Sequence, residues 1–155
     1  MLTIRHGNLN DLSDLQRLFE GTVTTVCRAD YDEAQTTVWA SSVENTARWE
    51  SIVKEQYLLV AEDDGLIVGF CSLAEGHYVD MLYVHKNHQS KGIATQLYHA
   101  IEAHARTLEI PVLTSDVSKT AKAFFEKVGF ALITPQTVVR KGVMIDNYKM
   151  AKRLV

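Results

Sequence analysis

The order of hydrophobic and polar positions predicts a strand and then two helical segments at the start of the chain. Leu2 and Ile4 alternate with polar residues, as the residues of a half-buried strand do. A helix follows, because apolar residues recur there at helical spacing. They are Leu12, Leu15, Leu18 and Phe19. A second helical pattern covers about Asp30 to Gln56, with a break near Ser41, and is interpreted as a helical insert or lid.

The middle of the chain has the pattern of a β-hairpin, a third strand and a helix. Two apolar runs, Tyr57 to Ala61 and Ile67 to Leu73, flank the turn signal Asp64-Gly65. A third strand is predicted from Tyr78 to Val84. After a polar turn, Gly92 opens an amphipathic helix. This order places a polar turn directly between a strand and a helix.

The last third of the chain predicts one more strand and helix and a closing hairpin. Ile110 to Leu113 form a buried strand, Ser115 to Ser118 a turn, and Lys119 to Lys127 a helix. Two final strands are predicted, Phe130 to Val139 and Val143 to Met150.

Composition narrows the class of protein. We expect one domain over residues 1–155, with 46% hydrophobic and 23% charged residues. A net charge of −3 argues against nucleic-acid binding. No signal-like or membrane-length apolar segment is visible, so the expected location is the cytoplasm, without a membrane partner. Cys27 and Cys71 match no metal or redox spacing and are expected to be free thiols in a reducing compartment, neither acting as a nucleophile.

The turn between the third strand and its helix can bind phosphate. Backbone N–H groups from Gln89 to Ala94 would form a concave donor site, because the first turn of a helix has unpaired N–H groups and a positive dipole end. Gly92 allows close approach of the backbone, and Lys91 adds a positive charge. The single glycine excludes both a Walker loop and a Rossmann turn.

At these residues the chain resembles the GNAT superfamily of N-acetyltransferases. Gln89, Gly92 and Ala94 match the family's strand-to-helix signature, and residues 118–130 resemble its second motif. The resemblance implies a three-layer α/β (α+β) fold. Its central mixed, strongly bent sheet has about six to seven strands and is flanked by helices on both faces. It also implies an acetyl-CoA-dependent enzyme without a metal.

The resemblance further implies where the donor binds. Pantetheine would lie between the strands Tyr78 to Val84 and Ile110 to Ser115, and the N–H of Leu82 would polarise the thioester carbonyl. The residues expected to contact the cofactor are Leu82, Tyr83, Val84, Gln89, Ser90, Lys91, Gly92, Ile93, Ala94, Ser118 and Phe125.

Two polar residues of the third strand are candidates for proton transfer. Direct attack on a thioester in a ternary complex requires a neutral amine, and therefore a proton acceptor. Strand alternation would place Tyr78, Asp80, Leu82 and Val84 on one face. Asp80 is the first candidate for the base and Tyr78 the second. The alternative is that Asp80 is a solvated or structural hydrogen-bond acceptor.

One departure from the family concerns the general acid. Many members have a tyrosine where this chain has Phe125, which carries no proton to donate and is expected to pack in the core. Another phenol could replace it, with Tyr83, Tyr148 and Tyr31 as the possibilities. Ser118 is expected to cap the following helix, and a contact with CoA is compatible with that role.

The acceptor is expected to be a primary amine of a small molecule or peptide. Arg28, Tyr31 and Trp39 are the candidate acceptor-binding residues, although tryptophans are more often core anchors. His85 and His88 approach metal-ligand spacing, but no third ligand completes a set. Two other functions remain open: a non-catalytic acyl-CoA-binding or sensor module, and an unrelated phosphate-binding domain. A homodimer is an expectation from the family alone.

Overall fold

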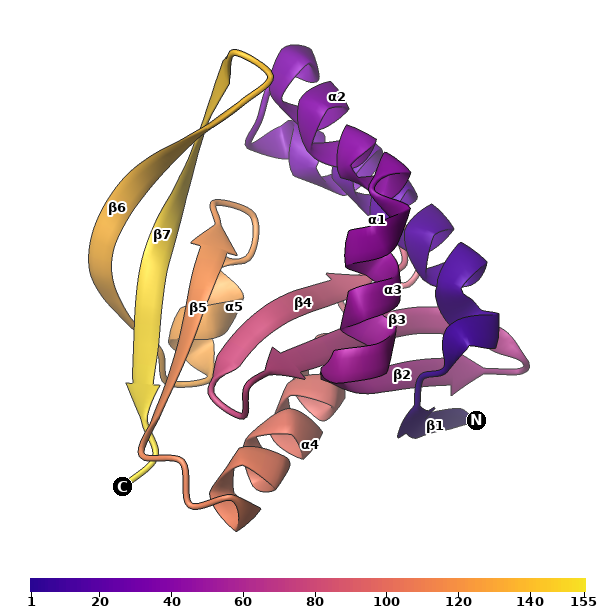
Figure 1. Cartoon of the computed structure of the whole chain (residues 1–155), viewed down its shortest axis with the longest axis vertical. Helices are drawn as coiled ribbons and strands as arrows, with labels where there is room; N and C mark the ends of the chain where they lie inside the picture. Colours follow the sequence, from indigo (N-terminus) through magenta and orange to yellow (C-terminus); the bar gives the residue numbers. More distant parts are fainter.

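The computed structural model contains one seven-stranded mixed sheet and describes every residue from 1 to 155. The strand order is β1-β2-β3-β4-β5-β7-β6, and the only parallel neighbours are β4 and β5. Helices cover both faces of the sheet, which opens widely between its two halves (Figure 1). The predicted α/β fold with a bent, mixed sheet is thereby confirmed.

The N-terminal third follows the predicted order of strand, helix and helical insert. The expected break near Ser41 is a 3₁₀ turn between two helices, and the side chains of Asp32 and Asn45 cap those helices by accepting backbone N–H bonds. The elements are β1 (Leu2–His6), η1 (Leu9–Asp11), α1 (Leu12–Thr25), η2 (Val26–Ala29), α2 (Glu33–Ala40), η3 (Ser41–Glu44) and α3 (Thr46–Glu55).

The remaining elements match the predicted order with one shifted strand. β5 does not end before Ser115, as the sequence predicted, but continues to Ser118, because these residues pair with β7 from Met150 to Asn147. Helix α5 begins correspondingly later. The elements are β2 (Tyr57–Asp63), β3 (Leu66–Ala74), β4 (Tyr78–Val84), α4 (Ile93–Thr107), β5 (Val112–Ser118), α5 (Lys122–Lys127), β6 (Ala131–Arg140) and β7 (Val143–Arg153).

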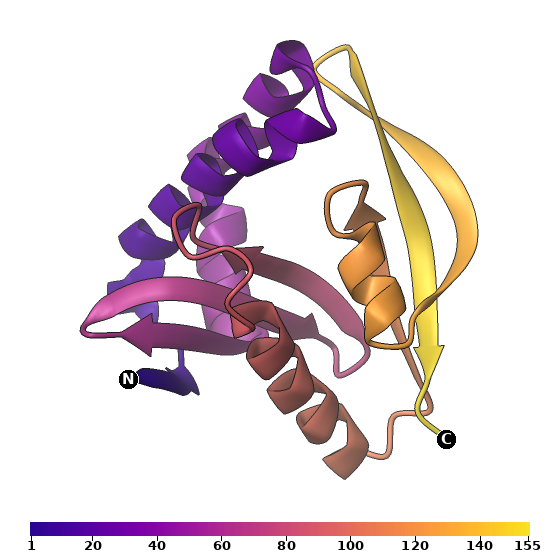
Figure 2. The same cartoon turned by 180° about the vertical axis from the view of Figure 1, so that it is seen from behind.

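Two hydrophobic clusters sandwich the sheet. On one face, α1 and α3 bury a cluster around Phe19, Trp49 and Phe70. On the other face lie α4 and α5 (Figure 2). They bury a larger cluster that includes Leu97 and Phe125. These helices are amphipathic or largely apolar on the side that faces the sheet, so burial of that side fixes their positions.

A β-bulge in β4 changes the direction of its side chains. The register with β3 pairs Ser72 with Met81 but Leu73 with Val79, so that Asp80 is the additional residue. Val79 and Leu82 consequently both face the cluster under α4 and α5. The expected alternation, with Tyr78, Asp80, Leu82 and Val84 on one face, is therefore wrong, because the bulge interrupts the period of two.

Strands β4 and β5 separate immediately after they meet. Their only paired residues are Tyr78 and Thr114. The Ser115 hydroxyl, 2.7 Å from the carbonyl oxygen of Val79, adds one link just beyond this pair. From there to Val84 the two strands diverge, and the gap opens toward the N-terminus of α4.

Candidate active site

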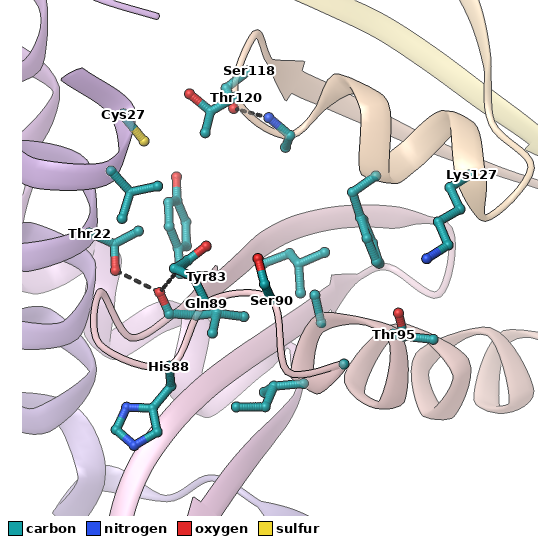
Figure 3. A pocket seen from close by; sticks show the side chains of 18 of the residues that line it. Thr22, Cys27, Tyr83, His88, Gln89, Ser90, Thr95, Ser118, Thr120 and Lys127 are labelled. Atoms are coloured by element: carbon teal, nitrogen blue, oxygen red, sulfur yellow. Dashed lines mark hydrogen bonds between the residues drawn. The ribbon is translucent and has the colours of Figure 1, made fainter. Parts of the chain in front are cut away.

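The first cavity, here called the donor cavity, lies between β4, the turn after it, and α5. It measures about 500 Å³, and Figure 3 shows most of the side chains that line it. Nine of the residues predicted to contact the cofactor line it. They are Leu82, Tyr83, Val84, Gln89, Ser90, Gly92, Ile93, Ala94 and Ser118. The sequence motif and the gap between β4 and β5 thus form one site.

The turn before α4 presents free backbone donors. The N–H groups from Gln89 to Thr95 donate to no acceptor within the protein, whereas the N–H of Gln96 bonds to Gly92. Gly92 and Ser90 have left-handed backbone conformations, with φ of +79° and +61°. An array of convergent N–H groups at a helix N-terminus binds anions. This part of the donor cavity can therefore hold a diphosphate.

Gly69 of β3 allows α4 to lie close to the sheet at this end. A Cβ atom at this position would be 3.0 Å from Ile93 and 3.1 Å from Leu97. A larger residue would push the first turn of α4 away from β3. The position of the N–H array therefore depends on a glycine outside the recognised motif.

The backbone of β4 has donors and acceptors that face the gap. His85 donates its backbone N–H to the carbonyl of Val68 in β3. Along β4, the backbone groups of successive residues point alternately toward β3 and away from it. The N–H and C=O groups of Leu82 and Val84 therefore point away from β3. The carbonyl of Val84 already accepts bonds from the Thr22 hydroxyl, at 2.8 Å, and the Gln89 amide, at 2.7 Å. Its N–H and the backbone of Leu82 remain for an extended ligand.

A second cavity, here called the acceptor cavity, continues from the first. It measures about 790 Å³ and lies between the helical insert, β4, β5 and the β6–β7 hairpin. The sides that the two cavities share are formed by Trp39, Leu82, Tyr83, Ser118 and Ala121. A molecule in one cavity can therefore meet a molecule in the other beside Leu82.

The Asp80 carboxylate lies in the acceptor cavity and is held by two side chains. Arg48 of α3 contacts both oxygens, at 3.0 and 3.2 Å, and Gln56 donates to Oδ2 at 2.7 Å. The Asp80 side chain is 11% exposed. A carboxylate has about four lone-pair positions, so Asp80 can accept one further hydrogen bond from a molecule in the cavity.

Tyr78 forms a second polar group in the same cavity. Its hydroxyl donates to Asp116 of β5 at 2.7 Å, and the Gln136 amide donates to the other oxygen of that carboxylate. Burial, together with the hydrogen bond to Asp116, raises the pKa of the Tyr78 phenol. The phenol therefore stays protonated near neutral pH.

Three of the predicted residues lie elsewhere. Lys91 is exposed and does not line the donor cavity, where Lys127 of α5 supplies a cation instead. Phe125 is 3% exposed in the core and reaches the acceptor cavity, while its neighbour Phe124 lines the donor cavity. Arg28 lines neither cavity, because the 3₁₀ turn η2 directs Cys27 inward and Arg28 outward.

The other predicted residues occupy the expected cavities, with structural contacts as well. Tyr31 and Trp39 line the acceptor cavity. The Tyr31 hydroxyl donates to the carbonyl of Asp146 at 2.6 Å and accepts the N–H of Lys119 at 2.9 Å. Ser118 accepts the N–H of Ala121 at 3.1 Å and so fixes the turn that precedes α5.

Sequence reasoning missed several residues of both cavities. Arg48 and Asp116 line the acceptor cavity, and Thr22, Thr120 and Lys127 line the donor cavity. Thr22, Arg48 and Asp116 lie outside the recognised motifs. Thr120 and Lys127 lie within residues 118–130, but the motif gave no sign that their side chains face the cavity. Asp116 could have been found only from the alternation of buried and more exposed residues along β5, and only if the full length of this strand had been predicted.

The cysteines are poorly suited to nucleophilic attack. Cys27 lines the donor cavity, but burial raises the pKa of its thiol to about 11. Complete burial also raises the pKa of Cys71. No group of three or more His, Cys, Asp or Glu residues is placed to hold a metal ion. No helix is long and apolar enough to cross a membrane.

The chain is similar to known proteins in both sequence and fold. Residues 27–153 match the family model described as acetyltransferase (GNAT) domain. The chain is 32% identical to the uncharacterised N-acetyltransferase YafP of Escherichia coli K12, over 96% of this chain and 94% of that protein. A GCN5-related N-acetyltransferase from Rhodopseudomonas palustris superposes with a TM-score of 0.94 at 31% identity, covering 98% of this chain and 95% of the other.

A more distant structure has the same fold. PaiA N-acetyltransferase from Thermoplasma acidophilum, determined in complex with coenzyme A, superposes with a TM-score of 0.78 at 18% identity and covers 99% of both chains. The family model spans most of the chain, and YafP aligns over almost its whole length. The chain belongs to the GNAT family and is an acetyltransferase.

Proposed function

We propose that this enzyme transfers the acetyl group of acetyl-CoA to a primary amine of a small molecule or peptide. One observation carries the proposal: the donor cavity and the acceptor cavity meet at Leu82, beside an array of free N–H groups. The pyrophosphate of CoA would occupy the turn from Gln89 to Thr95, and Lys127 would add a positive charge. The complex of PaiA with coenzyme A supports this choice of donor.

The thioester would lie between β4 and β5. Pantetheine amides would pair with the backbone of Leu82 and with the N–H of Val84, the groups that face the gap. The N–H of Leu82 would stabilise the oxyanion that forms as the amine attacks. Direct attack in a ternary complex is supported by the raised pKa of Cys27, which makes an acyl-enzyme unfavourable.

The acceptor amine would bind in the acceptor cavity, next to Asp80 and Tyr78. Asp80 retains one hydrogen-bond position and would orient the amine and receive its proton, while the neutral phenol of Tyr78 would supply a further contact. The apolar sides formed by Tyr31 and Trp39 would exclude water from the reacting groups.

A screen of amines tests this function. The purified protein is mixed with acetyl-CoA and a panel of small amines and peptides, and released CoA thiol is measured. We expect release that depends on an amine, together with a thermal shift caused by acetyl-CoA and by CoA but not by ATP. A non-catalytic acyl-CoA sensor would give the thermal shift without release of thiol, and a different phosphate-binding protein would respond to ATP.

A further inference from the structure

The charges that line the acceptor cavity balance one another. Three carboxylates and three cationic groups line it, so its formal charge is zero. They are Glu44, Asp80, Asp116, Arg48, Arg140 and Lys141. Because binding favours complementary charge, such a cavity suits an acceptor whose own charges cancel, rather than a polycation or a polyanion. A zwitterion that carries the reacting amine meets this condition.

Two of the three carboxylates are not available for a second ammonium group. Asp116 is directly opposite Lys149 in the pairing of β5 with β7, and the Cβ atoms of such a pair are roughly 5 Å apart. Glu44 lies 3.8 Å from the Nζ atom of Lys141. Both carboxylates thus have a cation of the protein beside them, and a diamine would find no separate site for its second charge.

Arg48 has hydrogen-bond donors that the protein does not use. A guanidinium group carries N–H donors on each of its nitrogens. In Arg48 only Nη2 is bonded, to the two oxygens of Asp80 at 3.0 and 3.2 Å, and the Nε and Nη1 atoms donate to no acceptor in the protein. The side chain lines the acceptor cavity and is 46% exposed. A guanidinium with free donors binds carboxylates well.

Arg48 and Asp80 present a positive and a negative group side by side. The bonded nitrogen and oxygen are 3.0 Å apart, and no other cation of the cavity pairs with Asp80. In an α-amino acid the amine nitrogen and the carboxyl carbon are about 2.5 Å apart, because both are bonded to one carbon. An amine on the vacant position of Asp80 therefore brings such a carboxylate to the free donors of Arg48.

We propose that the acceptor is a free α-amino acid with an apolar side chain, whose amine binds Asp80 and whose carboxylate binds Arg48. This inference rests on the proposed transfer from acetyl-CoA and names its acceptor. The side chain would lie against the apolar side of the cavity that Val38, Trp39 and Val138 form. Arg48 is then a specificity-determining residue, because it recognises a group that simple amines and peptide N-termini lack.

The transfer yields an N-acetyl amino acid and CoA. The ammonium group loses one proton to Asp80 before attack and a second proton after it, and both reach solvent. The nitrogen bonds to the acetyl carbon, the C–S bond breaks, and its electron pair goes to sulfur. The thiolate takes one proton from solvent. The carboxylate of the acceptor stays bound to Arg48 throughout and holds the amine at Leu82.

Two matched series of acceptors test the inference. One consists of phenylalanine, phenylalaninamide and phenethylamine, and the other of leucine, leucinamide and isopentylamine. Within each series only the carboxylate is changed or removed. Release of CoA thiol from saturating acetyl-CoA gives kcat and KM for each acceptor. We expect kcat/KM of the native enzyme to be at least about 10-fold higher for the amino acid than for its amide or for the plain amine.

Variants of Arg48 then show whether this residue reads the carboxylate. In Arg48→Gln we expect kcat/KM for the amino acid to fall roughly 10- to 100-fold, mainly through KM, and the preference within each series to disappear. Loss of the bond to Asp80 would affect all acceptors alike, so the preference reports on the carboxylate alone. Arg48→Lys keeps the charge and should keep part of the preference. Arg17→Gln, at a surface residue that is 74% exposed, is the control.

The possible failures are distinguishable. Equal or faster reaction of the plain amines or the amides, or release only with other amines and peptides, would overturn the amino acid as acceptor and leave the proposed function intact. A preference that persists in Arg48→Gln would show that another group binds the carboxylate. An equal loss for every acceptor would show that Arg48 acts only through Asp80. A native enzyme that releases no CoA with any amine or amino acid would contradict the proposed function itself.

Discussion

At the scale of single residues, two of the carboxylates that line the acceptor cavity have different surroundings. Asp80 is bound by the guanidinium of Arg48 and the amide of Gln56, while Asp116 is bound by the phenol of Tyr78 and the amide of Gln136. Asp80 lies on β4, closer along the strand to Leu82 than Tyr78 does. Its remaining acceptor position makes it the more suitable group to bind the amine.

Asp80→Asn tests this role. The amide keeps the shape of the side chain but is a poor proton acceptor, so we expect turnover to fall roughly 100-fold with little change in affinity for acetyl-CoA. Steady-state rates over a range of pH and the dissociation constant of acetyl-CoA measure the two effects. Asp14→Asn removes the same charge from an exposed site on α1 and is the control. Equal turnover of the Asp80 variant and native enzyme across pH would remove Asp80 from proton transfer.

At the scale of elements, the strand, turn and helix from Tyr78 to Thr107 were predictable because their signals are local. Apolar alternation, a polar turn and a helical period follow one another, and Gly92 marks the junction. The bulge at Asp80 and the full length of β5 were not predictable, since both depend on pairing with β3 and β7. The turn that lines the donor cavity was therefore predictable from the sequence, while Arg48 and Asp116 of the acceptor cavity were not.

Gly92→Val tests the turn. With φ of +79° at this position, a β-branched residue is strained, although no protein atom lies within 4 Å of its Cβ. A valine with this backbone conformation costs about 1–2 kcal/mol. The turn would relax to relieve this strain, which would displace the N–H groups from Gln89 to Thr95. We expect CoA binding to weaken roughly tenfold as a result. Calorimetric titration with CoA measures this. Gly65→Val provides a matched control, because its φ is +80° and its surroundings are equally open. A similar loss of affinity in both variants would show that the effect is global.

At the scale of the whole molecule, the gap between β4 and β5 leaves the two halves of the sheet with few direct links. β4 and β5 share one residue pair, so other contacts must keep the halves together. The cluster under α4 and α5 joins residues of both halves, among them Val68 of β3, Leu113 of β5 and Met150 of β7. Glu102 of α4 adds a polar link, because it accepts bonds from Tyr98, from Arg106 and from Lys152 of β7. Lys152 also donates to the carbonyl of Val128.

The link between α4 and β7 predicts how stability depends on pH. Burial would raise the pKa of Glu102, but the bonds from Lys152, Tyr98 and Arg106 outweigh it and lower the pKa to about 2. Because the pKa of Glu102 is lower in the folded protein, its carboxylate stabilises the fold at pH values above about 4.5, the ordinary pKa of a glutamate. This stabilisation is lost as the pH falls toward 2. The shift corresponds to at most about 3 kcal/mol, and solvent screening reduces it to about 1–2 kcal/mol.

Glu102→Gln should therefore lower the melting temperature by about 3–6 °C at pH 6, and the difference from the native protein should shrink toward zero near pH 2. Thermal unfolding followed by circular dichroism over this range measures both quantities. Glu126→Gln is the matched control, because Glu126 pairs with Lys122 on the surface and is 52% exposed, and exposed pairs contribute little. If the Glu102 difference were constant with pH, the carboxylate charge would not hold α4 to β7, and packing alone would maintain the gap between β4 and β5.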